Sequence, residues 1–145
     1  MRYTIENESI RLPVDSHGAE AVSVINVHNG AEMLWRGDAA VWGRHAPILF
    51  PYCGKLTEGK MIAKGVEYAG GQHGFARLLE HTLVERTETC LVLELCAGEE
   101  TLASFPYDFR LVSVFALEND TLHHTLTVEN LDEEKLPFGI GQIGK

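Results

Sequence analysis

Cysteine is scarce in this sequence. Cys53, Cys90 and Cys96 are the three in 145 residues, and their spacing matches no metal-ligand motif. So small and odd a number excludes a disulfide framework and is typical of the reducing cytoplasm. Long apolar runs are missing too. None approaches the roughly 20 residues that a membrane-spanning helix needs, and the N-terminus lacks the apolar core of a signal peptide. We therefore expect a cytoplasmic protein with no membrane partner.

Positive charge is the second shortage. The chain has 12 Lys and Arg against 21 Asp and Glu, which gives a formal net charge of −9. A surface with this balance repels the phosphates of nucleic acids and the headgroups of anionic lipids. Nucleic acid is therefore excluded as the expected partner.

Apolar residues, in contrast, are plentiful, at 45% of the 145 residues. A chain of about 150 residues buries roughly 70% of its unfolded surface, enough for one substantial core. No linker, repeat or low-complexity stretch divides the chain. The sequence thus predicts a single domain over residues 1–145.

The dominant pattern along the chain has a period of two. Apolar and polar residues alternate over 91–95 and 121–129, whereas 109–117 is almost wholly apolar, as in a strand covered on both faces. Long helical periodicity is absent, and 75–80 is the best short candidate. These patterns predict an all-β fold, an antiparallel β-sandwich or barrel.

Further strands are expected between turn-forming residues. Asn29-Gly30 is the pair preferred by a type I′ hairpin turn. The expected strands are 9–14, 19–26, 32–35, 61–63, 66–68 and 81–86.

Two segments do not resemble strands. Residues 42–59 and 70–77 combine glycine, proline, histidine and cationic residues with aromatic ones. Loops of this composition carry function more often than core strands do, because polar groups there do not compete with packing. Candidate functional residues are therefore sought in these loops.

His73 and Arg77 are the first candidates. Flanking glycines allow a histidine to approach a ligand closely, and imidazole titrates near neutrality, which suits proton transfer. The guanidinium of Arg77 offers a fork of donors for hydroxyls or phosphate. The alternative is an exposed loop histidine beside a cation at the rim of a strand, and for a lone histidine that is the commoner case.

Arg44 and Lys55 are the second pair. They are candidates to line a polar pocket walled by Trp42, Phe50 and Tyr52, and aromatic faces beside charged groups are what sugar binding needs. The alternative is that these aromatic residues belong to the core and the cations are solvated.

No metal or cofactor is expected. His123 and His124 are adjacent, so on a strand they point to opposite faces and cannot bind one ion together; one is expected in the core and the other exposed. Residues 139–144 match the G-x-G-x-x-G pattern of dinucleotide sites, but no helix follows to hold a pyrophosphate.

Several motifs in series resemble the aldose 1-epimerase family, most closely its bacterial galactose-mutarotase-related branch. They follow the family's order and span nearly the whole chain, which makes them more specific together than singly. The motifs are 35–38 (WRGD), 42–51 (WGRHAPILFP), 54–56 (GKL), 72–77 (QHGFAR), 101–109 (TLASFPYDF) and the segment 130–140 that ends in LPFGI.

This resemblance implies the N-terminal half of a galactose-mutarotase-like β-supersandwich that interconverts the α and β anomers of a hexose or hexose phosphate. His73 matches the family's first histidine, which binds or protonates the ring oxygen. Arg77 matches the cation of the HGFAR motif, and Lys55 stands where the family usually has a binding arginine. With Arg44, these residues form the expected substrate site.

The sequence departs from the family near its end. Ile143 stands where the family has a second histidine, and the family's glutamate base belongs to a C-terminal half that this sequence does not contain. We therefore expect weakened turnover, and the alternative is a non-catalytic carbohydrate-binding or vestigial β-domain. An interaction module with coincidental motifs is a third reading. Self-association through exposed strand edges is also expected.

Overall fold

The structure is a computed structural model that describes residues 1–144. Its strands pair in antiparallel fashion, and helix is confined to one short α-helix, α1 (Glu99–Leu102), and two 3-10 turns. The strands are β1 (Arg2–Glu6), β2 (Ile10–Asp15), β3 (Glu20–Ala21), β4 (Ile25–Asn26), β5 (Ile48–Leu49), β6 (Lys60–Ala63), β7 (Val66–Ala69), β8 (Thr82–Arg86), β9 (Cys90–Cys96), β10 (Phe109–Glu118), β11 (Thr121–Asn130) and β12 (Gly141–Gln142).

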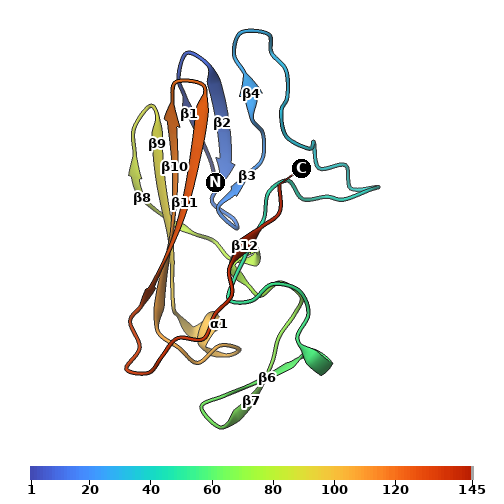
Figure 1. The fold of residues 1–145 in the computed structure, drawn as a ribbon, viewed down its shortest axis with the longest axis vertical. Coiled ribbons are helices and arrows are strands. Elements are labelled where there is room, and N and C mark those ends of the chain that lie inside the picture. Colours follow the sequence, from blue (N-terminus) through green and yellow to red (C-terminus); the bar gives the residue numbers. More distant parts are fainter. Residues whose placement is uncertain (145) are drawn as a thin grey trace.

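Two four-stranded sheets form the body of the fold (Figure 1). In the first, β1, β2 and β3 are neighbours and β4 also pairs with β2; the order of the second is β11-β10-β9-β8. Alternate residues of β2 and β9 are buried, as the period of two predicts. Leu12 and Val14 from the first sheet share one core with Leu91, Leu93 and Phe115 from the second. The prediction of an antiparallel β-sandwich is confirmed.

The β6–β7 hairpin projects from this body (Figure 1). Its strands are joined by Lys64 and Gly65, which both have positive φ angles, of 51° and 76°. Two central residues with positive φ are the mark of a type I′ turn. The type I′ turn predicted at Asn29-Gly30 is wrong, because there only Gly30 has a positive φ, of 71°.

The strands expected at 19–26 and 32–35 are also wrong in part. The first is broken into β3 and β4, and 32–35 contributes a single bridge between Ile25 and Glu32. The cause is the Glu32 side chain, whose Oε1 accepts the N–H groups of Val24 at 2.8 Å and Leu34 at 2.9 Å. A side chain that occupies backbone donors in this way takes the place of a strand ladder.

Local signals failed at three other places. The helix considered at 75–80 is a 3-10 turn over Ala76–Leu78, and α1 was not predicted. Strand β1 was missed as well, although its pairing with β2 is continuous from Arg2↔Asp15 to Glu6↔Arg11.

Candidate functional site

The two loops chosen from composition meet at Phe50 and Gly74, which form a parallel bridge. The Phe50 carbonyl accepts the N–H groups of Phe75 at 3.0 Å and Ala76 at 3.2 Å. Gly74 has a φ of 70°, and a Cβ atom there would lie 2.2 Å from the Phe50 carbonyl oxygen. Only glycine allows this approach, so Gly74 holds the loop of His73 against the end of β5.

His73 is fixed by a reciprocal pair of bonds with Gly54. Its N–H donates to the Gly54 carbonyl at 2.7 Å, and the Gly54 N–H donates to its Nδ1 at 2.8 Å. Because a backbone N–H can only donate, Nδ1 is an acceptor and carries no proton. The neutral ring then bears its proton on Nε2. The half-buried imidazole therefore presents a hydrogen-bond donor beyond the loop.

Lys55 follows Gly54 directly and is exposed. Within residues 1–144 its ammonium group makes no hydrogen bond or ion pair. Its charge is thus available one residue from the backbone that holds His73.

Arg77 lies on the other side of His73 in the chain. Its Nη2 donates to the Gln72 carbonyl at 2.9 Å, while its Nε is buried and has no partner among the described residues. Burial, and secondly the charge of Arg44, lower the pKa of the Arg77 guanidinium, which Glu20 partly offsets. Arg77 is therefore a half-buried cation whose Nε donor is unpaired among the described residues.

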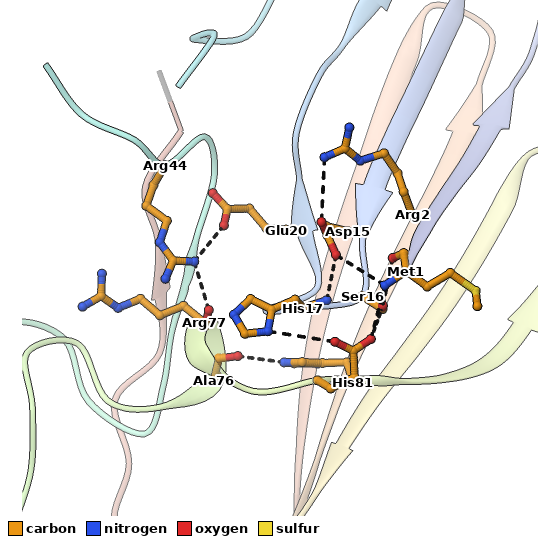
Figure 2. Close-up of polar contacts among 11 residues, drawn as sticks. Met1, Arg2, Asp15, Ser16, His17, Glu20, Arg44, Ala76, Arg77 and His81 are labelled. Carbon is orange, nitrogen blue, oxygen red and sulfur yellow. Dashed lines mark hydrogen bonds and ion pairs between the residues drawn. The ribbon is translucent and has the colours of Figure 1, made fainter. Parts of the chain in front are cut away.

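Arg44 joins Arg77 to the first sheet (Figure 2). Its Nη1 lies 3.0 Å from the Arg77 carbonyl and 3.2 Å from Oε2 of the buried Glu20. The structure thus brings Arg44 to Arg77, and Arg77 to the segment of His73. Lys55 is linked to His73 through its neighbour Gly54, which is hydrogen-bonded to His73.

Sequence reasoning missed Glu20 and Gly54. Glu20 was assigned to a strand, and nothing in its neighbourhood signals that it reaches residues 44–46. Phe50 was weighed as a wall of the site, but it is fully buried and packs on Phe75, Phe105 and Phe109. For Phe50 the core alternative holds.

The C-terminal segment lies against the same loop. Strand β12 pairs with β5, and the Ile143 N–H donates to the Pro47 carbonyl at 3.3 Å. Ile143 brings an apolar side chain here, which cannot transfer a proton.

His81 supports the segment of Ala76 and Arg77 through a buried hydrogen bond (Figure 2). It is 2% exposed, and its Nε2 lies 2.9 Å from the Ala76 carbonyl, so Nε2 carries the proton. Its Nδ1 is buried and has no partner within residues 1–144. Burial lowers the pKa of His81 below its ordinary 6.5.

This lowered pKa predicts an acid-sensitive fold. Below about pH 6.5 the unfolded chain takes up a proton at His81 that the folded chain does not. The contribution of His81 to the free energy of unfolding is therefore fully present above that pH. It decreases as the pH drops, by at most about 1.4 kcal/mol per pH unit. We expect His81→Gln to flatten the dependence in urea unfolding between pH 7.5 and 5.5. His123→Gln, at an exposed position, is the control. If His81→Gln leaves the pH dependence of the free energy of unfolding unchanged, the account is contradicted.

Two kinds of feature are in question among the described residues, metal-binding clusters and membrane-spanning helices. No group of three or more His, Cys, Asp or Glu side chains in residues 1–144 could hold a metal ion. His123 is exposed while His124 stacks on Phe115, so the two point apart as expected. No helix in the described part of the chain has the length and apolar character that crossing a membrane requires.

Comparison with known proteins decides the family. The family model described as aldose 1-epimerase matches residues 1–142. The chain belongs to the aldose 1-epimerase family. Among curated members it is 32% identical to the plasmid-encoded protein LacX of Lactococcus lactis, over 97% of this chain and 49% of LacX. The chain thus spans about half the length of the curated relatives it matches.

Solved structures related to the aldose 1-epimerase family show the same fold. A galactose mutarotase related enzyme from Lactobacillus acidophilus is 37% identical, with a TM-score of 0.96 over 98% of this chain and 47% of that one. A galactose mutarotase-like protein from Lactobacillus casei is 32% identical, with a TM-score of 0.94 over 98% and 48%. The fold described above is therefore a galactose-mutarotase-like fold.

Proposed function

We propose that this chain acts in the cytoplasm on a hexose or hexose phosphate, and that His73, Lys55, Arg77 and Arg44 form its sugar site. The observation that carries the proposal is the bond from the Gly54 N–H to His73 Nδ1, at 2.8 Å. It leaves an Nε2–H donor on the same two loops as Lys55 and Arg77, whose charged groups no described carboxylate directly pairs. Family membership supports a sugar as the ligand.

The reaction proposed is exchange of the two anomers through the open-chain sugar. A base removes the proton of the anomeric hydroxyl, the C1–O5 bond breaks, and its electron pair moves to the ring oxygen. The ring oxygen takes up a proton from water, which gives the open-chain aldehyde with a free hydroxyl at C5. Rotation about C1–C2 and closure on the other face give the second anomer. The ring oxygen gains negative charge as the bond breaks, so a donor aimed at it stabilises the transition state more than the ground state.

His73 suits the donor role in this scheme. While Nδ1 accepts from Gly54, the ring holds one proton, so it acts by donating a hydrogen bond rather than as a charged acid. Glu20 is not placed to act as the base, because its oxygens already accept from Arg44 and from two backbone N–H groups. The base is a carboxylate or water outside this network.

Sugar binding tests the site directly. We expect D-galactose or D-glucose to shift the backbone NMR signals of Gly54, His73 and Arg77, with a dissociation constant on the order of 1 mM. Lys55→Ala should weaken binding about 3-fold or more without changing the unfolding midpoint, since Lys55 is exposed and unbonded. Lys60→Ala is the matched control, because Lys60 pairs with Glu67 in the β6–β7 hairpin, at 3.0 Å. If the NMR spectrum does not change even at high sugar concentration, the proposed site is refuted.

We also propose self-association through the outer edge of β11. Within residues 1–144 this ten-residue strand pairs with β10 alone, so one row of its backbone groups is left for another strand. Sedimentation velocity should show a concentration-dependent dimer, and a monomer at all concentrations would exclude it.

A further inference from the structure

Glu20 is the one acidic residue that is buried within residues 1–144. Its exposed fraction is 5%. A carboxylate is removed from water at high cost unless its oxygens are paired and hydrogen-bonded. Glu20 meets this requirement with three partners from one loop: Oε1 accepts the N–H groups of His45 at 2.6 Å and Ala46 at 3.0 Å, and Oε2 pairs with Arg44 Nη1 at 3.2 Å.

The two oxygens of Glu20 have separate tasks. Oε1 holds the backbone of residues 45–46, and Oε2 holds the side chain of Arg44. Arg44 uses the same Nη1 to reach the Arg77 carbonyl, at 3.0 Å. A continuous line of polar contacts therefore runs from β3 through Glu20 and Arg44 to Arg77.

Gly18, two residues before Glu20, also contacts the segment that contains Arg77. The Gly18 N–H donates to the Leu79 carbonyl at 2.7 Å, and a Cβ atom on Gly18 would lie 2.8 Å from the Arg77 carbonyl oxygen. The backbone of Arg77 is thus held between Gly18 and Arg44. Its guanidinium is left to bond the Gln72 carbonyl, next to His73, with Nε buried and unpartnered.

We infer that Glu20 is a positioning residue of this site: acting through Arg44, it sets where Arg77 presents its guanidinium, at the Gln72 carbonyl that precedes His73 in the chain. The inference deepens the proposed function and rests on it for the sugar, but its structural part concerns the free protein. Glu20 touches no ligand in this arrangement, since its oxygens are already engaged.

Glu20→Gln separates the two tasks. The amide oxygen still accepts from the N–H groups of His45 and Ala46, whereas the amide NH2 faces Arg44 and cannot accept its proton. In the free protein we expect the Arg77 Nε–H signal in the NMR spectrum to shift and to exchange faster with water. Sugar affinity should fall about 10-fold, the loss typical of a charge-assisted bond.

Two further variants make the test specific. Arg44→Lys keeps a positive charge for Glu20 but loses the planar fork, so it should reproduce both changes even if Glu20→Gln does not fold. The double variant Glu20→Gln/Arg44→Lys should change the Arg77 Nε–H signal and the sugar affinity little more than either single variant, because both substitutions act on one line of contacts. Glu94→Gln removes the carboxylate that pairs with Arg110 at 2.6 Å in the second sheet, and should change neither readout.

The outcomes distinguish the inference from the proposed function. An unchanged Arg77 Nε–H signal in both Glu20→Gln and Arg44→Lys overturns the inference, whatever the sugar does. A changed signal with 10-fold weaker sugar binding supports it. A changed signal in a protein whose wild type binds no sugar supports the positioning of Arg77 by Glu20 and overturns the sugar site instead.

Discussion

Gly74→Ala is expected to destabilise the protein by at least about 2 kcal/mol and to displace His73. The new methyl group would meet Phe50 backbone atoms, the oxygen at 2.2 Å and the carbonyl carbon at 2.5 Å. That backbone cannot retreat, because the Phe50 side chain is fully buried and its carbonyl holds Phe75 and Ala76. The φ of 70° adds a strain that L-residues avoid.

Gly71→Ala is the matched control from the same loop. A Cβ atom there meets nothing within 4 Å, and its φ is not in the left-handed region. Its free energy of unfolding should stay within about 0.5 kcal/mol of wild type, as for other surface substitutions. Urea unfolding of both variants measures the difference. Equal stability of Gly74→Ala and Gly71→Ala would show that the approach of Gly74 to Phe50 is not what holds the loop.

Much of the sheet structure was predictable because apolar and polar residues alternate along its strands. The alternating residues of β9 and β11 occupy the two faces that the period of two assigns to them. The failures lie where a side chain replaces the backbone ladder. Glu32 binds the N–H groups of Val24 and Leu34, and no property of residues 19–35 alone signals that.

The sequence names candidate residues for the proposed site, but not the contacts that hold them in place. His73 and Arg77 stand in a loop whose composition and motif mark it. The contacts of Gly54 and Glu20 could not be found in the same way, since they join residues 19 and 24 positions or more apart in the chain. Such contacts depend on how the loops fold onto the sheets, and a single sequence does not display them.

Under the proposed function, His73→Asn is expected to remove most of the acceleration of mutarotation. Asparagine tolerates positive φ better than most residues, so it suits the 66° of His73 and leaves the loop in place. Its shorter side chain withdraws the donor that Nε2 supplies. Groups that stabilise charge on a reacting atom contribute typically 100-fold or more, so the accelerated part of the rate should fall by about that factor.

The most direct test is polarimetry of freshly dissolved α-D-glucose and α-D-galactose, with wild type, His73→Asn and His123→Asn in the same buffer. The account predicts that wild type and His123→Asn, whose substitution lies on exposed β11, both approach the equilibrium rotation faster than buffer alone. His73→Asn should approach it at the rate of buffer. Absence of acceleration by folded wild type, or equal acceleration by His73→Asn, would contradict the claim that His73 serves anomer exchange.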